Sequence, residues 1–306
     1  MNVAATIIPI FAIIILGWLA RRRGFLPPEF LGPANRLVYH IAIPAMIFNA
    51  LSRATLTSQF SPLIIALTLI SACCAYGVAW LAALAVKLPS NRKGTFIQCA
   101  GHGNLGYIGL AVAFYFMGES GLTRASIVAG FLMIVQNLLS VIALQAFSEP
   151  ESSGRSLGRL AMKIMGNPVI LSAIAGILFS SLGLTLPLVV QRSLEIVSGM
   201  ALPTALLLIG ATLSFKLIRD YWRTVLSVAT IKLGVLPAIG LILFRSFHLA
   251  APEYTPALIL LAAPTATIAY VMAGEMQGDP DAAVATISAV TLLSALTLTF
   301  WLHLGA

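Results

Sequence analysis

Long apolar runs, separated by short polar segments, follow one another along the whole chain. Each run is close to the roughly 20 residues that an α-helix needs to cross the hydrocarbon core of a bilayer. The longest polar segment, 148–163, is rich in Ser, Gly, Glu and Arg. The pattern predicts an all-α integral membrane protein with ten transmembrane helices. We place these helices at 3–20, 31–52, 61–86, 94–117, 122–147, 164–182, 187–214, 222–247, 256–277 and 282–304.

The composition indicates that lipid is the solvent for much of this chain. Of its 306 residues, 59% are hydrophobic and only 9% are charged, whereas soluble domains carry about 25% charged residues. The net charge of +8 does not indicate nucleic-acid binding, because the basic residues lie in short connections without interleaved aromatic residues. Cys73, Cys74 and Cys99 fall within apolar runs, where cysteine behaves as a small hydrophobe. We expect no disulfide framework, no metal site and no cofactor.

Basic residues are divided unequally between the two sets of connections, with twelve on one side and four on the other. Because cytoplasmic loops carry an excess of Lys and Arg, this predicts both termini outside and the central segment in the cytoplasm. The first apolar run precedes its basic residues, an order that opposes a cleavable signal peptide. The twelve are Arg21, Arg22, Arg23, Lys87, Arg92, Lys93, Arg155, Arg159, Lys163, Lys216, Arg219 and Arg223, and the four are Arg53, Arg124, Arg192 and Arg245.

The central polar segment divides the chain into two halves. We expect a first five-helix repeat at 1–147, a short cytoplasmic linker at 148–163 and a second five-helix repeat at 164–306. Because each repeat has an odd number of spans, the second must cross the membrane in the opposite sense to the first. Inverted repeats of this kind are typical of secondary transporters.

Helix interruptions occur at matched positions in the two halves. Pro44 and Pro203 are 159 residues apart (203 − 44), and the same offset leads from Asn104 to Ala263, next to Pro264. Proline removes a backbone hydrogen bond inside a helix, and in a membrane the freed groups need other partners. Taken alone, Pro44 or Pro203 is better explained by a simple kink.

The fourth expected span contains the strongest helix-breaking sequence, Gly101–Gly109, with four glycines and two polar side chains in nine residues. Where such a segment crosses the break at Pro264, unpaired N–H groups and half-helix N-termini face a cavity. Their positive partial charge favours an anionic ligand. The alternative is that the glycines only let neighbouring helices pack closely.

Asn104 is the first candidate for a substrate-binding residue at these breaks. Its side-chain amide offers two donors and one acceptor, which suits a carboxylate, although it is also a good helix cap. Glycines let the backbone approach a ligand, and threonines supply hydroxyl groups. The further candidates of this set are Gly103, Gly106, Gly109, Pro264, Thr265 and Thr267.

Four other polar residues within expected spans are candidates with an alternative structural role. Gln136 and Asn137 form a polar step in the fifth span, where they either coordinate substrate or join neighbouring helices by hydrogen bonds. His102 is a candidate proton-linked switch or a packed neutral histidine. Lys232 lies inside the eighth span. Because intramembrane charges are costly, it either attracts an anion, pairs with Glu195 or extends its ammonium towards the interface.

The segment Asn104–Leu110, Asn-Leu-Gly-Tyr-Ile-Gly-Leu, resembles the fourth-helix signature of the auxin efflux carrier family. That signature reads Asn-x-Gly, an aromatic or apolar pair, then Gly-Leu-Pro. The sequence Asn-Arg-Leu-Val at 35–38, followed by Ile43 and Pro44, resembles the second helix of the family, and Ala-Ala-Pro-Thr-Ala at 262–266 resembles the ninth. The resemblance covers essentially the whole chain. Ala111 departs from it by replacing the usual proline, so that the break depends on its glycines.

The resemblance implies a fold shared with bile-acid/sodium symporters and sodium/proton antiporters. In that fold, broken helices 4 and 9 cross, and a transport domain moves against a scaffold domain in an elevator manner. The family resemblance also implies carboxylate substrates and a homodimer. The short linker resembles that of bacterial members, which implies a multi-pass protein of the bacterial inner (plasma) membrane.

Together these observations predict a secondary, efflux-type carrier for a small organic anion, a carboxylate, with a proton or sodium as a coupling ion or with transport driven by membrane potential. The expected partners are the carboxylate and membrane lipid, and no nucleic acid. The alternative is a sodium-coupled symporter of the bile-acid type. We expect no enzyme, because the spans show no Ser with His and no Asp pair. A receptor that does not transport would leave the matched breaks unexplained.

Overall fold

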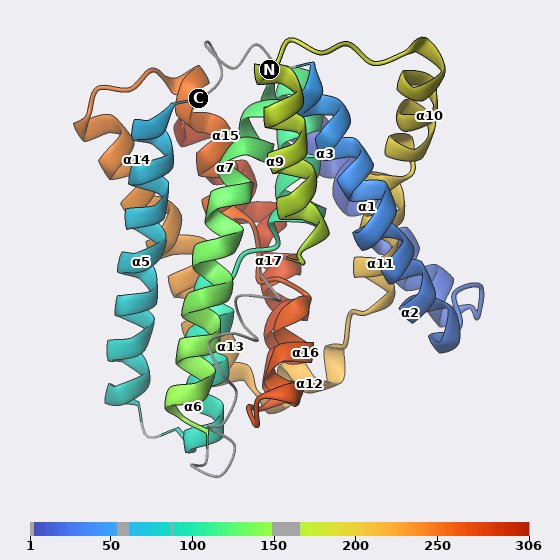
Figure 1. Cartoon of the computed structure of the whole chain (residues 1–306). Coiled ribbons are helices and arrows are strands. Elements are labelled where there is room, and N and C mark those ends of the chain that lie inside the picture. Colours follow the sequence, from blue (N-terminus) through green and yellow to red (C-terminus); the bar gives the residue numbers. More distant parts are fainter. Residues whose placement is uncertain (1–2, 54–60, 87, 149–165, 306) are drawn as a thin grey trace.

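The computed structural model describes residues 3–53, 61–86, 88–148 and 166–305. Figure 1 shows a bundle of helices, and within the described ranges the structure has no β-strand beyond one isolated bridge. Six helices or helix groups in this part of the chain are long and apolar enough to cross a membrane. They are Val3–Arg22, Pro62–Ala85, Leu105–Ala146, Leu188–Ala211, Trp222–Ser246 and Pro280–Gly305.

The remaining apolar runs form shorter helices. In chain order, the helices are α1 (Val3–Arg22), α2 (Pro28–Leu37), α3 (Ile43–Ser52), α5 (Pro62–Ala85), α6 (Ser90–Gly101), α7 (Leu110–Ala146), α9 (Pro168–Ser181), α10 (Leu188–Gly199) and α11 (Ala201–Ala211), followed by α12 (Phe215–Asp220), α13 (Trp222–Ala229), α14 (Leu236–Ser246), α15 (Ala251–Ala262), α16 (Ile268–Glu275) and α17 (Pro280–Gly305). Three π-helical segments lie between them: η1 (Val38–Ala42), η2 (Leu105–Gly109) and η4 (Thr230–Val235).

The boundary expected between 117 and 122 is a turn inside α7. Gly118 has φ 68° and ψ −157° there, a conformation that side chains with a Cβ rarely adopt. A Cβ added to Gly121 would lie 2.6 Å from the carbonyl oxygen of Ala113. This short distance shows that the chain folds back tightly. The first part of α7 therefore corresponds to the end of the fourth expected span, and the second part corresponds to the fifth.

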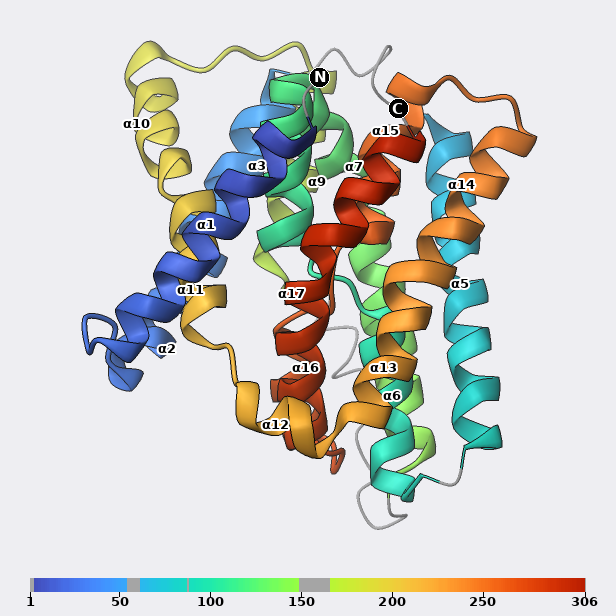
Figure 2. The same ribbon diagram turned by 180° about the vertical axis from the view of Figure 1, so that it is seen from behind.

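Two groups of helices can be followed in Figures 1 and 2. On one side, α1 packs against α11, and α3 packs against α9 and α10. On the other side, α5 packs against α6, α7 and α14, while α17 contacts α12, α13, α15 and α16. The expected division into repeats at 1–147 and 164–306 stays a prediction, and the linker at 148–163 lies almost wholly outside the described residues.

The basic residues of the described chain gather towards one end of the bundle. The helix α1 begins and α17 ends at the same end of the molecule, whereas α12 and the start of α6 lie at the other (Figures 1 and 2). The second end carries Arg92, Lys93, Lys216 and Arg219. Four basic residues of the twelve, Lys87, Arg155, Arg159 and Lys163, lie outside the described residues.

Two of the π-helical segments have an identifiable cause. Pro44 follows η1 and Pro237 follows η4 by two residues, and a proline cannot donate to the carbonyl four positions before it. For Pro237, that carbonyl belongs to Leu233. It accepts a hydrogen bond from Nε1 of Trp301 at 2.7 Å instead. A side chain of α17 thus satisfies the group that the proline leaves free. The consequence is a wider turn of η4 around Lys232.

Glycines set the close contact between α1 and α11. A Cβ added to Gly210 would lie 1.8 Å from the carbonyl oxygen of Ile14, and one added to Gly17 would lie 2.1 Å from that of Leu207. Neither position has room for a side chain. The backbones of the two helices therefore touch, as small residues allow in membrane bundles.

We predict that Gly210→Leu lowers the free energy of unfolding by about 3 kcal/mol or more, because the added side chain must separate α1 from α11. The matched control is Gly77→Leu in α5, where an added Cβ meets no atom within 4 Å. Thermal unfolding of the purified variants in detergent measures the difference. Equal melting temperatures for the two variants would contradict the close contact.

Candidate functional site

The first helix interruption lies between α6 and η2. The helix α6 ends at Gly101, His102 and Asn104 are not helical, and η2 begins at Leu105. A Cβ added to Gly101 would lie 2.1 Å from the ring of Tyr76, so this ring packs directly on the backbone at the end of α6. The interruption expected from the glycine-rich segment is present, and it occupies 102–104.

The second interruption lies between α15 and α16. The helix α15 ends at Ala262, Ala263 has an extended ψ of 140°, and α16 begins at Ile268. Pro264 has no N–H with which to continue the helix, and it favours an extended conformation of the residue before it. The break therefore follows from local sequence.

The two interruptions pair with each other across the bundle. Gly103 and Thr265 form an isolated antiparallel bridge. The N–H of Asn104 donates to the carbonyl of Pro264 at 2.7 Å, and the N–H of Ala266 donates to the carbonyl of His102 at 2.9 Å. Backbone groups that lost their helical partners thus satisfy each other, as an apolar environment requires. The structure brings together the two segments that the sequence singled out.

The hydroxyl group of Thr265 adds a further link between the interruptions. Its Oγ1 donates to the carbonyl of Cys99 in the last turn of α6 at 2.9 Å, and the residue is fully buried. The sequence-based expectation was that this hydroxyl is available to a ligand. In this conformation its donor is used by the protein, so Thr265 holds the two breaks together.

Gln136 clamps the first interruption from α7. Its Oε1 accepts from the N–H of Gly103, and its Nε2 donates to the carbonyl of Gly101, both at 3.2 Å. The side chain is fully buried. One amide therefore replaces two helical hydrogen bonds at the break. Gln136 reaches the crossing, as expected, but its polar atoms hold the backbone in this conformation.

A second buried network connects the same break to α5. The ring Nδ1 of His102 lies 3.0 Å from Oγ of Ser140, and that oxygen lies 2.8 Å from the hydroxyl of Tyr76. Tyr76 also donates to the carbonyl of Gln136 at 3.1 Å. His102 is thus packed and hydrogen-bonded, while a role as a proton-linked switch stays a prediction.

Asn104 has one polar atom that the protein uses and one that it does not. Its Oδ1 accepts from the N–H of Tyr107 at 3.2 Å, which makes it the cap of η2. Its Nδ2 is buried and has no hydrogen-bond partner among the described residues. A buried donor without a partner costs about 1–3 kcal/mol. A ligand oxygen that accepts a hydrogen bond from this atom would remove that cost.

Lys232 brings a cationic group to the crossing. Its side chain is fully buried, and its Nζ donates to the carbonyl of Leu261 in the last turn of α15 at 3.0 Å. A Cβ added to Gly103 would lie 3.2 Å from this Nζ, so the ammonium lies beside both breaks. Glu195 instead forms an exposed ion pair with Arg53 at 2.7 Å. The alternative that Lys232 pairs with Glu195 is therefore wrong.

The remaining candidates lie around this centre. Gly109 packs against α15, because an added Cβ would lie 2.8 Å from Cδ2 of Leu260, whereas Gly106 has room for one. Asn137 is half-buried, and its Nδ2 donates to the carbonyl of Met133 in its own helix at 2.7 Å. Thr267 is half-buried at the start of α16. Substrate contacts by these four residues stay predictions.

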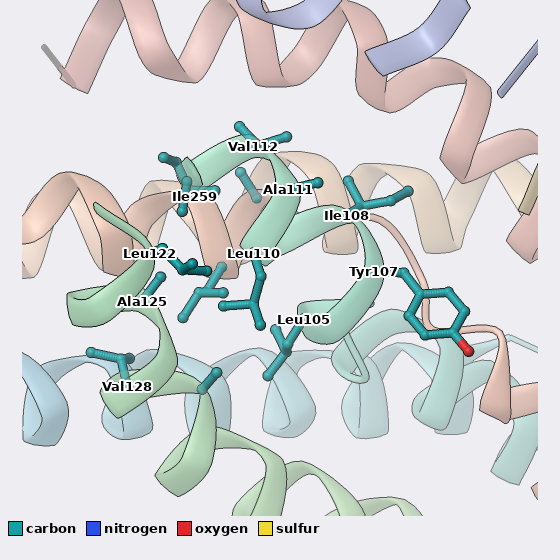
Figure 3. Packing of buried hydrophobic residues seen from close by; sticks show 14 of the residues in the cluster. Leu105, Tyr107, Ile108, Leu110, Ala111, Val112, Leu122, Ala125, Val128 and Ile259 are labelled. Carbon is teal, nitrogen blue, oxygen red and sulfur yellow. The ribbon is translucent and has the colours of Figure 1, made fainter. Parts of the chain in front are cut away.

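The apolar surroundings of the break are shown in Figure 3. Leu105 and Leu110 point towards Leu122, Ala125 and Val128 of the second part of α7. Tyr107 points away from this cluster, and its hydroxyl donates to Oδ1 of Asn35 in α2 at 2.5 Å. Ala111, which replaces the expected proline, is fully buried in a continuous part of α7. The break persists without that proline because it lies earlier, at 102–104.

Sequence reasoning missed three buried polar residues near the crossing: Tyr76, Ser140 and Gln98. Gln98 lies one turn before His102 on α6 and is fully buried, with its Nε2 3.2 Å from Sδ of Met272. Its Oε1 has no partner in the described part of the chain. The four-residue spacing from His102 places both on one helix face, a signal that was available in the sequence.

The crossing is closed in this conformation. Asn104 is 5% exposed, and Thr265 and Lys232 are 0% exposed. A cavity of about 420 Å³ instead lies near the beginning of α6, lined by Ser90, Asn91, Phe147 and Gln277. The 12 residues of α6, about 18 Å of helix, separate Ser90 from the break. Loading a ligand at the crossing therefore requires a movement.

Comparison with known proteins shows to which family the chain belongs. The model of a family described as membrane transport protein matches residues 2–302. The chain belongs to this auxin efflux carrier-like family of membrane transport proteins. The family resemblance expected from the sequence is therefore confirmed.

Relatives in this family match along almost their whole length. A protein of Rhizobium meliloti named "Putative malonate transporter" is 26% identical over 307 residues, covering 99% of this chain and 96% of the relative. An uncharacterized transporter of Methanothermobacter thermautotrophicus is 25% identical over 304 residues, with 98% of both chains covered. Another, of Methanocaldococcus jannaschii, is 24% identical over 302 residues, with 95% of each covered.

We predict that Gln136→Leu lowers the free energy of unfolding by about 2–6 kcal/mol, because it leaves the carbonyl of Gly101 and the N–H of Gly103 buried without partners. The adjacent change Asn137→Leu is the matched control. Its amide only donates within its own helix, so we expect a loss below about 1 kcal/mol. Thermal unfolding in detergent measures both. A loss from Asn137→Leu as large as that from Gln136→Leu would contradict the clamp.

Proposed function

We propose that this family member is a secondary, efflux-type transporter that moves a small organic anion, a carboxylate, across the plasma membrane. The observation that carries the proposal is the buried Nδ2 of Asn104, which has no partner among the described residues. It lies where two interrupted helices cross, beside an ammonium group. A carboxylate offers the acceptor that this donor lacks.

One relative supports a small carboxylate as substrate. It carries the name of a malonate transporter and matches the present chain over 99% of its length. Malonate has two carboxylate groups and no other polar group, so it can only accept hydrogen bonds at neutral pH. We therefore propose malonate and similar short carboxylates as the first compounds to test.

We further propose that ten helices cross the membrane as two inverted five-helix repeats and that transport follows an elevator mechanism. In this proposal α1, α3, α9, α10 and α11 form the scaffold, and the helices that carry the crossing form the transport domain. The packing within each group supports this division. The closed crossing is compatible with this proposal, because a ligand can reach Asn104 only after part of the surrounding protein has moved.

The same proposal includes the bacterial inner membrane as location, both termini outside, the linker in the cytoplasm, and a homodimer. The gathering of basic residues at the end opposite to the start of α1 supports the orientation, since cytoplasmic segments are enriched in Lys and Arg. The coupling ion is an outcome of the experiment below, because sodium and potassium salts of one carboxylate distinguish a sodium-coupled symporter from the other mechanisms.

We predict that malonate raises the melting temperature of the purified protein and that Asn104→Asp abolishes this shift. At 100 times its dissociation constant, a ligand stabilises the native state by about 2.7 kcal/mol. Aspartate keeps the oxygen that caps Tyr107, but it replaces the free donor by a negative charge. Thermal shifts with potassium malonate, sodium malonate and chloride controls measure the effect.

Two outcomes would contradict the proposal in different ways. If a folded Asn104→Asp variant binds malonate as well as the unchanged protein does, Asn104 is only a cap. If the unchanged protein binds no short mono- or dicarboxylate, the organic anion itself is wrong. A shift that requires sodium would favour the sodium-coupled symporter.

A further inference from the structure

The ammonium group of Lys232 is the starting point, because it is a buried cation without a carboxylate partner in the described part of the chain. The side chain is 0% exposed, so its ammonium does not extend to an interface. The two ion pairs of the described residues, Arg53 with Glu195 and Arg92 with Asp279, do not include it. Charged groups inside a membrane are costly unless a partner or a cavity receives them.

The protein compensates this charge only in part. The Nζ atom donates to the carbonyl of Leu261. This carbonyl lies in the last turn of α15, where carbonyls have no partner within the helix. A helix C-terminus carries about −0.5 of an elementary charge, which is less than the full positive charge of a protonated ammonium. The contact therefore leaves the crossing electropositive.

The fold holds the ammonium at this position by several independent features. Lys232 lies in η4, the segment that precedes Pro237. Trp301 satisfies the carbonyl of Leu233 next to it. Gly103 has no side chain where the ammonium lies, since a Cβ there would be 3.2 Å from Nζ. The arrangement puts the charge against the first interruption.

Hydrogen-bond donors are in excess on both sides of Gly103. An ammonium has three donors, and among the described residues one acceptor is recorded for it. The Nδ2 of Asn104, the next residue along the chain, has none. A ligand at the ammonium group gains from acceptors and from a negative charge, whereas Nδ2 of Asn104 needs only an acceptor. A carboxylate has these properties, whereas the corresponding neutral amide has one acceptor oxygen, a donor NH2 group and no charge.

We propose that Lys232 is the charge-selecting residue of this site, which makes the crossing accept carboxylates and discriminate against neutral compounds of the same shape. The inference rests on the proposed function, because it assumes that the ligand binds at the crossing. It assigns the two donors different tasks. Asn104 recognises an oxygen acceptor of any charge, whereas Lys232 recognises the charge.

The experiment compares pairs of compounds of similar shape, one charged and one neutral: malonate with malonamide, succinate with succinamide, and acetate with acetamide. Dissociation constants come from thermal shifts or calorimetry on the full-length protein in detergent. The variants are Lys232→Gln, which keeps a donor for the carbonyl of Leu261 without the charge, and Lys232→Met as a second neutral replacement. Asn104→Ala is the comparison variant.

We expect the unchanged protein to bind one or more of the carboxylates at least tenfold more tightly than the matching amide. Lys232→Gln should reduce this ratio tenfold or more, by weakening the carboxylate and leaving the amide unchanged or stronger. Asn104→Ala should weaken both members of a pair and leave the ratio within a factor of about three, since it removes a donor and no charge.

Several results would overturn the inference. A neutral variant that weakens carboxylate and amide equally shows that Lys232 only stabilises the end of α15. A neutral variant that binds the carboxylate as tightly as the unchanged protein also overturns it, while the proposed function stands. An unchanged protein that binds amides as tightly as carboxylates overturns the charge selection directly. Binding of no compound in the panel instead overturns the proposed function and the inference together.

Discussion

The pairing of two interrupted helices is the interaction on which the rest of this structure depends. In hydrocarbon, each unsatisfied backbone group costs several kcal/mol, so neither interruption is stable alone. The bridge between Gly103 and Thr265 gives each break the partners that it lacks. Gln136 and the hydroxyl of Thr265 complete the remaining groups at the end of α6. The polar centre of the protein thus arises from the need to satisfy its backbone.

The two crossing helices end in chemically different ways. The carbonyls at the end of α6 receive neutral donors, the amide of Gln136 and the hydroxyl of Thr265. The end of α15 receives the ammonium of Lys232. Both solutions satisfy hydrogen bonds, but the second also adds a positive charge to an apolar interior, where electrostatic interactions are screened far less than in water. The ends of α6 and α15 therefore differ in the charge of the groups that donate to them.

Close backbone contacts and wide turns have complementary roles around this centre. At Gly210 and Gly17 the helices α1 and α11 touch without intervening side chains, which gives one group of helices a tight interface. Around Pro237 the helix widens, and a tryptophan of α17 donates to the freed carbonyl. Between the two groups, Tyr107 donates to Asn35. The break is therefore held internally by its own hydrogen bonds and is joined to α2 by one further side-chain hydrogen bond.

Much of this architecture follows from the sequence, because apolar length, glycine and proline act locally. The helical class and the interruptions near Asn104 and Pro264 were determined in this way, since a helix cannot continue through a proline without losing a hydrogen bond. Family membership also followed, because the motifs keep their order along the chain. The sequence could not show which atoms remain without partners. Gln136 and Thr265 are candidates for a ligand contact, with interhelical hydrogen bonding as the alternative for Gln136, and the fold places backbone groups against both. The Nδ2 donor of Asn104 has no partner among the described residues, and the ammonium of Lys232 lies beside the interruption at Gly103. Both facts depend on the crossing of segments that are distant in the chain. Hydrogen bonding between segments distant in the chain is a property of the folded structure, so tertiary structure alone decided which candidate side chains have polar atoms that the protein itself does not use.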